Sequence, residues 1–298
     1  MRWSRGHTGA IEDRRSQGSV GGFGMGGGGG GMGIPIPVGV GGGAGLLLFI
    51  AIVVLNLLGG GGGGSIGGGL TPLGGQAVEP VGTPDLTNNG DEVEFIGYVA
   101  DDANQLWGDT FQRAGQPYTP TKVVLFTGGT QSGCGPASSD TGPFYCPIDQ
   151  KVYLDLDFFS ELRQRFNAPG DFAEAYVVAH EIGHHVQNQA GIEQQVRDLQ
   201  QQDPSRQNEL SVKLELQADC LAGVWAQSVY KEGDLEAGDI DEALNAASAV
   251  GDDRIQASAG VAVNPETWTH GSAEQRSSWF KTGYQTGDPA KCDTFAQA

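Results

Sequence analysis

The stretch Ala179–His185 contains the pattern His-Glu-x-x-His, whose residue types and spacing can activate water on a metal ion. Because His180 and His184 are four residues apart, both imidazoles leave the same face of an α-helix and can bind one Zn²⁺. Glu181 is offset around the helix, where its carboxylate can reach a zinc-bound water as a general base. The pattern is short enough to arise by chance, so the prediction of a zinc site depends on its surroundings.

A catalytic zinc site needs a third protein ligand and an open position for water. One known solution is a third histidine six residues after His184, but Ala190 stands there. Glu215, on a later helical pattern, supplies another solution. Asp219, one turn further on, can accept the N–H of one ligand histidine and so fix its tautomer. Three other choices of ligand remain open: Glu193, Glu209 and Asp219 itself.

Carboxylates usually lie on a solvated helix face, but Glu215 and Asp219 share their helical pattern with several apolar residues. These apolar residues are Leu214, Ala218, Leu221, Ala222 and Trp225. Such a helix must pack in the core, so its carboxylates are candidates for buried groups with charged or hydrogen-bonding partners. This pattern favours Glu215 as the third ligand.

Peptide hydrolysis also needs a donor to the oxyanion of the tetrahedral intermediate. His270, on a loop before a helix start signal, is the candidate catalytic residue for this role, and Tyr153 and Tyr176 are alternatives. A loop histidine held by ordinary hydrogen bonds fits the sequence equally well. His185 leaves the helix in another direction from His184, so we expect it to be structural or to support a ligand.

The elements around the motif have recognisable signals. Asp171 with Glu174 resembles a capping box at a helix start, and Gly191 is placed to end that helix. The other predicted elements are a helix from residue 91 to about 114, strands at 122–126 and 151–159, helices at 208–230 and 240–255, and a short helix from 272. The strand at 151–159 is predicted to be the sheet edge along which an extended peptide aligns.

The composition predicts that the folded part of the chain begins at about residue 91. The chain has 298 residues, 50 of them glycine, and most of residues 21–75 are too rich in glycine to bury a core. The formal net charge of −19 argues against a nucleic-acid partner, because phosphate binding needs a basic surface.

An uncharged apolar run at residues 45–58 has three interpretations. A cleaved signal peptide is one interpretation, but this run starts unusually far from the N-terminus and is followed by glycines in place of a small-residue cleavage site. A buried core helix is another, but the residues around the run could not form a core. A single transmembrane anchor fits best, extended by residues 38–44 toward the required length of about 20. Four arginines precede the run: Arg2, Arg5, Arg14 and Arg15. They predict a cytoplasmic N-terminus and an extracytoplasmic catalytic domain.

The predicted organisation has five parts. They are a cytoplasmic basic tail (1–20), a Gly-rich segment (21–43), a transmembrane anchor at the cell membrane (44–58), a Gly/Pro-rich linker (59–90) and a metallopeptidase-like domain (91–298). The four cysteines all follow the apolar run, and their even number in an exported domain predicts two disulfides. Cys134–Cys146 is the natural local pair and leaves Cys220–Cys292, although four buried thiols remain an alternative.

With these residues in view, the chain resembles the bacterial neutral zinc metallopeptidase family of membrane-anchored proteins. The matching stretches are Met1-Arg-Trp, Glu12-Asp-Arg-Arg15, Gly142-Pro-Phe-Tyr-Cys-Pro147, Val152-Tyr-Leu-Asp-Leu156, Ala175–Gln187, Glu215-Leu-Gln-Ala-Asp-Cys220, Thr269-His-Gly-Ser272 and Glu274-Gln-Arg276. The resemblance implies a gluzincin-like site with His180, His184 and Glu215 as ligands and Glu181 as base.

We therefore expect an α+β, mainly helical, zincin-like domain behind a single N-terminal transmembrane helix. The expected activity is hydrolysis of peptide bonds in a peptide or protein substrate, through a zinc-bound water. The alternatives are a non-catalytic envelope binding or assembly module with a zinc site, and a scaffold built on the anchor and glycine tracts. Glu181 favours the enzyme, because a structural zinc site has no use for a carboxylate beside its first histidine.

Overall fold

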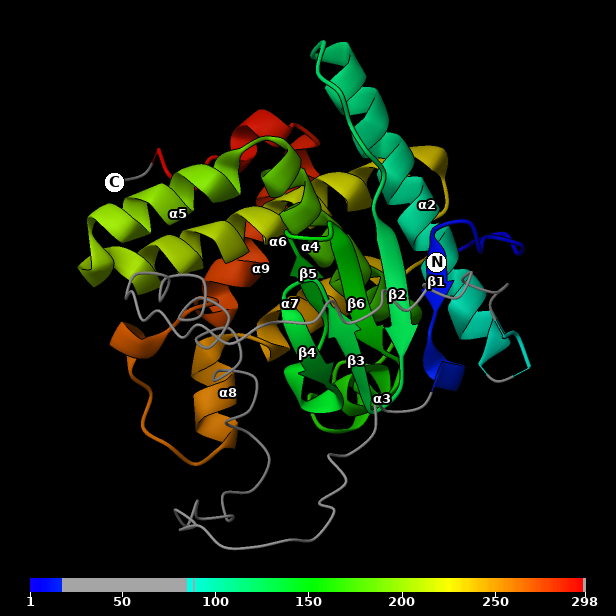
Figure 1. Cartoon of the computed structure of the whole chain (residues 1–298), viewed down its shortest axis with the longest axis horizontal. Helices are drawn as coiled ribbons and strands as arrows, with labels where there is room; N and C mark the ends of the chain where they lie inside the picture. Colours follow the sequence, from blue (N-terminus) through cyan, green and yellow to red (C-terminus); the bar gives the residue numbers. More distant parts are fainter. Residues whose placement is uncertain (18–84, 88, 297–298) are drawn as a thin grey trace, which may run out of the picture.

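The computed structural model describes residues 1–17, 85–87 and 89–296, which form a set of helices packed against a small sheet (Figure 1). The strands are β1 (Ile11–Asp13), β2 (Lys122–Phe126), β3 (Gly129–Ser132), β4 (Gly135–Ser138), β5 (Phe144–Cys146) and β6 (Lys151–Asp155). The α-helices are α2 (Gly90–Arg113), α3 (Asp157–Gln164), α4 (Asp171–Gln189), α5 (Ile192–Gln202), α6 (Gln207–Glu232), α7 (Asp239–Ala249), α8 (Asp252–Ser258) and α9 (Ala273–Thr286). Short 3-10 turns are η1 (Arg15–Gln17), η2 (Ser139–Thr141), η3 (Pro204–Arg206), η4 (Pro265–Thr267) and η5 (Pro289–Cys292). The prediction of a mainly helical α+β fold is confirmed.

The main sheet has the strand order β1-β2-β6-β5, and β3 with β4 forms a separate hairpin. β1 pairs with β2 and β2 with β6 in parallel, whereas β5 pairs with β6 antiparallel. β2 is buried from Val123 to Phe126, which explains its unbroken apolar run. The strand predicted at 151–159 ends earlier, at Asp155, because α3 begins at Asp157. β6 is also an interior strand, so the prediction that it forms the sheet edge is wrong, and the edge on that side is β5.

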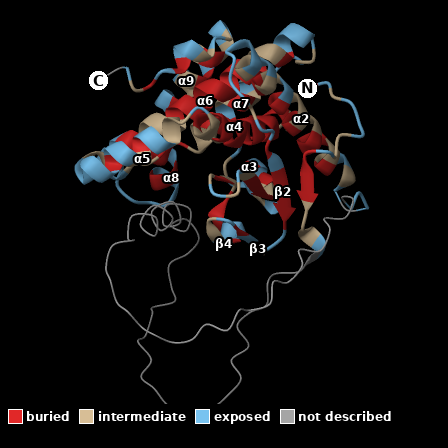
Figure 2. Cartoon of the chain, turned by 45° about the horizontal axis from the view of Figure 1, so that its top comes forward, coloured by how far each residue is buried: buried red, intermediate tan, exposed pale blue. Residues whose placement is uncertain are grey.

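The motif helix α4 lies at the centre of the helical layer, against α2, α6 and α7, where Figure 2 shows the buried residues concentrated. It begins at Asp171 after Gly170, which has φ 119°, and ends before Gly191, which has φ 74°. The predicted end is confirmed. The predicted capping box is wrong, because the first turn of α4 is bound by a residue of another helix: the Glu242 carboxylate of α7 accepts the backbone N–H of Phe172. The Glu174 carboxylate instead pairs with Arg163.

A close approach between α4 and α6 brings the two halves of the motif together. A Cβ atom built on Gly183 would lie only 3.1 Å from the carbonyl oxygen of Ala218. The missing side chain lets the two helix backbones come close at this point. Glu215 and Asp219, within one turn of Ala218 on α6, therefore reach the histidines of α4.

The helix predicted at 240–255 is two helices, α7 and α8, which are separated at Gly251. A Cβ on Gly251 would lie 2.3 Å from the backbone nitrogen of Ala273, so this glycine allows the α9 start to pack closely. The interruption turns Asp252 toward the loop before α9, where its carboxylate accepts three backbone N–H groups. Alanine-rich periodicity in the sequence hides this break.

The N-terminal residues, predicted to be a separate basic tail, are part of the folded domain. β1 is an edge strand of the main sheet (Figure 1). Its residues Ile11 and Glu12 are buried. Lys151 donates a hydrogen bond to the Glu12 carboxylate at 2.6 Å, which ties β1 to β6 across the sheet. A strand of three residues is too short for a recognisable alternation, and its partner β2 lies more than 100 positions away, so sequence periodicity missed it.

Within the part of the chain that the structure describes, no helix combines the length and apolar character that a membrane crossing requires. The predicted anchor at 44–58 lies outside the described residues, as do the Gly-rich segment at 21–43 and most of the linker predicted at 59–90.

Candidate metal centre

The three predicted ligands lie together on α4 and α6. His180 Nε2 is 3.2 Å from one Glu215 oxygen, and His184 Nε2 is 3.5 Å from the other. All three offer a ligand atom within 4.8 Å of one another. Two imidazole nitrogens converge on one carboxylate because the i, i+4 spacing stacks both histidines on the same face of α4. The arrangement can hold a small cation that accepts nitrogen and oxygen ligands.

Asp219 fixes the orientation of His180. Its Oδ1 lies 2.9 Å from His180 Nδ1, so this carboxylate accepts the Nδ1–H and leaves Nε2 for the metal side. The Asp219 side chain is fully buried and is also bound by Tyr176 Oη at 2.5 Å and Arg276 Nε at 2.8 Å. Arg276 thus balances a buried negative charge that would otherwise be costly. The predicted partner role of Asp219 agrees with this geometry.

Gln187 fixes the orientation of His184, as Asp219 fixes that of His180. Its side-chain oxygen accepts the Nδ1–H of His184 at 2.8 Å. The amide nitrogen of Gln187 donates to the carbonyl oxygen of Leu214 at 2.8 Å, which fixes the direction of the amide. Sequence reasoning missed this residue, although its position three residues after His184 on the same helix face was a usable signal.

The charges of the cluster are strongly coupled. Burial alone would raise the pKa of Glu215, but the imidazole of His184, with that of His180, holds it well below its usual range. Burial likewise lowers the pKa of His184, yet the Glu215 carboxylate outweighs that effect and raises it to about 10. The Glu215 carboxylate and the two imidazoles therefore stabilise one another electrostatically.

Glu181, next to the first ligand, is 8% exposed. Burial raises its pKa above the usual carboxyl range, while the neighbouring His180 and His184 oppose that shift. A carboxylate with a raised pKa accepts a proton more readily than a solvated one. Glu181 lines the same cavity as both histidines, as expected for a general base.

His270 reaches the same cavity from the other side of the fold. Its Nδ1 lies 3.2 Å from Asp252 Oδ1, and the backbone nitrogens of Thr269, His270 and Gly271 all donate to Asp252 Oδ2. Asp252 thus holds both the loop and the imidazole. Within the described residues the His270 Nε2 has no hydrogen-bond partner, which leaves this atom for a ligand. Apart from its acidic side chain, Asp252 carries no local pattern that predicts this role.

The alternatives left open by the sequence lie in other environments. Glu209 is on the surface, where it pairs with Arg206 and Lys213. Glu193 lines the cavity but pairs with Arg197 at 3.1 Å and is not part of the three-ligand group. The two candidate tyrosine donors are engaged elsewhere: Tyr176 with Asp219, and Tyr153 with Asp149. His270 is therefore the predicted donor that the structure places at the cavity with a ring nitrogen available.

The cavity beside the cluster has a volume of about 270 Å³ and is largely apolar. Its apolar lining includes Pro143, Phe144, Pro147, Phe158, Phe166, Val177, Leu214, Val250 and Ile255. The edge strand β5 contributes Phe144 and Tyr145 to this wall. The cavity therefore lies between the metal-ligand cluster and the edge strand of the main sheet.

A hydrogen-bond chain fixes β5 to the motif helix. His185 Nε2 donates to the carbonyl oxygen of Thr119 at 2.7 Å, so its Nδ1 must be the acceptor of the Tyr145 hydroxyl, at 3.0 Å. Asn188 in turn donates to the Tyr145 oxygen at 2.8 Å. Burial lowers the pKa of His185. Its two hydrogen bonds make it a structural residue, one of the two roles predicted from the sequence. It connects the cavity wall to the helix that carries the ligands.

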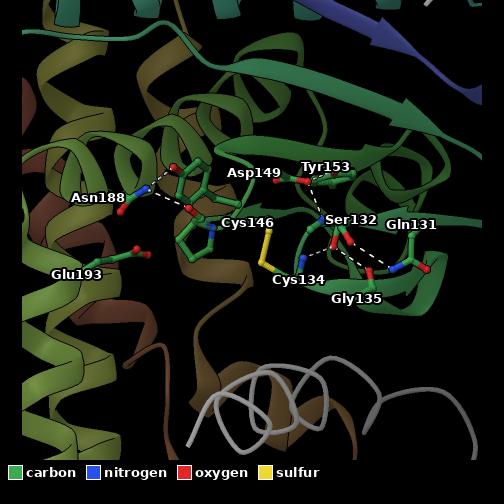
Figure 3. Close-up of a disulfide and its surroundings, with 12 residues drawn as sticks. Gln131, Ser132, Cys134, Gly135, Cys146, Asp149, Tyr153, Asn188 and Glu193 are labelled. Atoms are coloured by element: carbon green, nitrogen blue, oxygen red, sulfur yellow. Dashed lines mark hydrogen bonds between the residues drawn. A yellow bond between two sulfur atoms is a disulfide. The ribbon is translucent and has the colours of Figure 1, made fainter. Parts of the chain in front are cut away.

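Both predicted disulfides are present. Cys134–Cys146 joins the β3–β4 turn to the end of β5, and Figure 3 shows it between the hairpin residues and Asn188 and Glu193 of the helical side. Cys220–Cys292 joins α6 to η5, and Cys220 directly follows Asp219. Each disulfide therefore restrains an element that borders the candidate site.

A second group of acidic residues, Asp171, Asp239 and Glu242, also has its oxygens close together. The amino group of Met1 lies 2.8 Å from Asp171 and 3.4 Å from Asp239. These carboxylates therefore already have a cationic partner, and they differ from the His-Glu cluster in having no imidazole.

Comparisons with known proteins give a consistent result. A family model described as "Putative neutral zinc metallopeptidase" matches residues 1–295. "Uncharacterized protein YpfJ" of Escherichia coli (strain K12) is 48% identical over 218 residues, which cover 72% of this chain and 76% of that protein. "Uncharacterized protein Rv2575" of Mycobacterium tuberculosis (strain ATCC 25618 / H37Rv) is 53% identical over 192 residues, 61% of this chain and 64% of that protein. No solved structure matches the chain.

Proposed function

This chain belongs to the neutral zinc metallopeptidase family, and from that membership we propose that it hydrolyses peptide bonds with zinc as its cofactor. The observation that carries the proposal is the convergence of His180, His184 and Glu215 beside a buried Glu181 at an apolar cavity. We further propose that the fold is zincin-like.

The donor set fits Zn²⁺. Two imidazole nitrogens and one carboxylate are the ligands of known catalytic zinc sites. Among the described residues, the group has three protein donors, which leaves a position open for water or substrate. Zinc bound there would supply Lewis acidity, lowering the pKa of a coordinated water to about 7 and polarising the scissile carbonyl group.

The chain's own residues then have separate roles. Glu181 takes the proton of the attacking water and passes it to the nitrogen of the leaving amine. His270, held at Nδ1 by Asp252, offers its Nε2 to the substrate carbonyl oxygen as negative charge develops there. Asp219 and Gln187 hold the two ligand imidazoles in the tautomer that presents Nε2.

The substrate is proposed to be an extended segment of a peptide or protein. An extended peptide can add to the edge strand β5, which borders the cavity. The cavity's apolar lining favours large apolar side chains near the scissile bond.

The location outside the cytoplasm and the attachment to the cell membrane are also proposals. Two disulfides support an oxidising compartment. The apolar run at residues 45–58 supports contact with a membrane.

The test uses the purified full-length protein, loaded with zinc, against a mixed peptide library with and without chelator. Glu181→Gln should bind zinc as the parent does but lose cleavage by about 10²–10⁴-fold, because only the proton acceptor is removed. Glu215→Ala should lose both zinc and cleavage. Glu209→Ala, a change on the exposed part of the same helix α6, is the matched control and should keep both.

A parent protein that binds zinc but cuts no peptide in the library would reject the peptidase in favour of a zinc-binding envelope module. A Glu181→Gln variant that cuts as well as the parent would show that the cleavage does not depend on the proposed general base, and would reject this site as its source.

A further inference from the structure

Residues 1–17 contact the rest of the domain along their whole length. The backbone nitrogen of Arg2 donates to the carbonyl oxygen of Asp234 at 2.7 Å, and Trp3 packs edge-on against Phe95 of α2. Further on, β1 pairs with β2 in parallel register, with Ile11 opposite Val123. The segment therefore adds a strand to the sheet and also packs against α2.

The contact with α2 depends on the absence of a side chain at Gly97. A Cβ at this position would lie 1.8 Å from the carbonyl oxygen of His7, a separation that no real Cβ adopts. Backbone is therefore packed directly on backbone at this point. Among the described residues, the atoms nearest to that Cβ all belong to His7 and Ile11 of the N-terminal segment.

The two ends of the chain that flank residues 18–84 are bound to each other. The Arg15 guanidinium donates to the carbonyl oxygen of Asp85 at 2.6 Å. The backbone nitrogen of Asp85 donates to the carboxylate of Asp13 at 2.9 Å. The chain thus leaves the domain and returns to it at the same corner.

We propose that residues 1–17 and 85–296 form one folded unit that lies on one side of the membrane, with residues 18–84 as an insertion between its two parts. A single crossing of the roughly 30 Å hydrocarbon core would place the flanking ends on opposite sides. Ends joined by hydrogen bonds of 2.6 and 2.9 Å cannot be separated in that way. Residues 1–17 and 85–296 therefore lie on the same side of the membrane in the folded protein.

Three of the four arginines that predicted a cytoplasmic N-terminus have side-chain partners inside this unit. Arg5 pairs with Asp91, Arg14 with Glu12 and Arg15 with Asp13. Their presence near the apolar run therefore has a structural cause that does not depend on membrane orientation. With the proposed location of the domain, the N-terminal strand also lies outside the cytoplasm.

The test measures the side of each part in the full-length protein. All four cysteines are in disulfides, so a single introduced cysteine is the only free thiol. Ser4→Cys marks the N-terminal segment and Ser258→Cys marks the rest of the domain, and both serines are exposed. Spheroplasts making each variant are treated with a membrane-impermeant maleimide before and after lysis, with the parent protein as the background control.

Both positions should label in intact spheroplasts. If both label only after lysis, the single unit is supported, and the extracytoplasmic location proposed with the function is rejected. If one position labels before lysis and the other only after it, the single unit is overturned. None of these results depends on whether the protein cleaves peptides, so the peptidase proposal is tested independently.

A second experiment tests the packing itself. Gly97→Ala should release the N-terminal segment, so that trypsin cuts after Arg14 and Arg15 faster than in the parent protein. Gly108→Ala, on the same helix, is the matched control, because its Cβ would meet only a Tyr118 ring carbon at 3.7 Å. Equal trypsin sensitivity of the two variants would contradict the packing of the N-terminal segment on Gly97. If Gly97→Ala fails to fold while Gly108→Ala folds, the packing is supported.

Discussion

Asp219 Oδ1 lies 2.9 Å from Nδ1 of His180, and this one contact links the two halves of the metal centre. It fixes the imidazole so that Nε2 approaches Glu215, which lies one turn before Asp219 on α6. The carboxylate can remain charged while fully buried because Arg276 binds both of its oxygens. The ligand geometry therefore depends on three helices, α4, α6 and α9.

Asp219→Asn should weaken zinc binding by about 10–100-fold, because the amide is a poorer acceptor and no longer fixes the His180 tautomer. Competition with a chromogenic chelator measures the affinity. Since Arg276 loses its buried partner, the free energy of unfolding should also fall, by about 3–5 kcal/mol. Asp198→Asn, where the carboxylate accepts only from Gln194 on the surface of α5, is the control and should change neither quantity. An unchanged zinc affinity in Asp219→Asn would remove Asp219 from the site.

Tyr145→Phe should lower kcat/KM and destabilise the protein by about 1–3 kcal/mol, because His185 Nδ1 loses its donor and Asn188 its main acceptor. The loss of activity is expected because the same hydroxyl holds β5 beside α4. Tyr118→Phe removes a comparable hydrogen bond, to Asn104, on the other side of the His185 ring. Tyr118 does not line the cavity, so this control should lose stability but keep activity. Equal activity losses in both variants would indicate a purely structural effect.

The parts of the site that follow from helix periodicity could be predicted from the sequence. His180 and His184 lie one turn apart on α4, and Glu215 and Asp219 lie one turn apart on α6, the two helices on which they were expected. Gln187 was within reach of the same reasoning, since it follows His184 by three residues. The α4 end at Gly191 was readable for the same local reason.

The parts that depend on distant packing could not be predicted. Asp252 reaches His270 only because Gly251 interrupts the helical pattern, and Arg276 reaches Asp219 only through the packing of α9 on α6. The strand β1 was missed because three residues carry no period. Its charged neighbours were interpreted as a membrane signal, although they bind Glu12, Asp13 and Asp91 within the domain.

Removal of residues 1–17 should destabilise the domain. Residues 85–298 alone would expose the edge of β2 and leave the Lys151 ammonium without Glu12. Loss of Ile11 burial alone costs about 1.5–3 kcal/mol. Joining residues 1–17 to Asp85 by a short Gly-Ser linker should restore the thermal midpoint, because the two ends already touch. The linked chain carrying Ile11→Asp is the control and should melt like the truncated one. A truncated domain as stable as the linked one would contradict the role of β1.

Glu174 should make the stability fall as the pH rises through weakly acidic values. Burial, with repulsion from Glu92, raises its pKa to about 7, although Arg163 opposes the shift. The folded protein then binds this proton more tightly than the unfolded chain, whose carboxyl has its usual pKa near 4.5. The contribution is fully present below about pH 4.5 and is lost as the pH rises to about 7.

Glu174→Gln should therefore gain stability over the parent protein between these pH values, on the order of 2–3 kcal/mol in total, measured by urea unfolding at pH 5, 6, 7 and 8. Glu209→Gln is the control. Hydrogen bonds from Arg206 and Lys213 lower the pKa of Glu209 to about 2, so its difference from the parent should stay constant across the same series. A Glu174→Gln difference that does not change between pH 5 and pH 7 would mean that this carboxyl titrates normally in the folded protein.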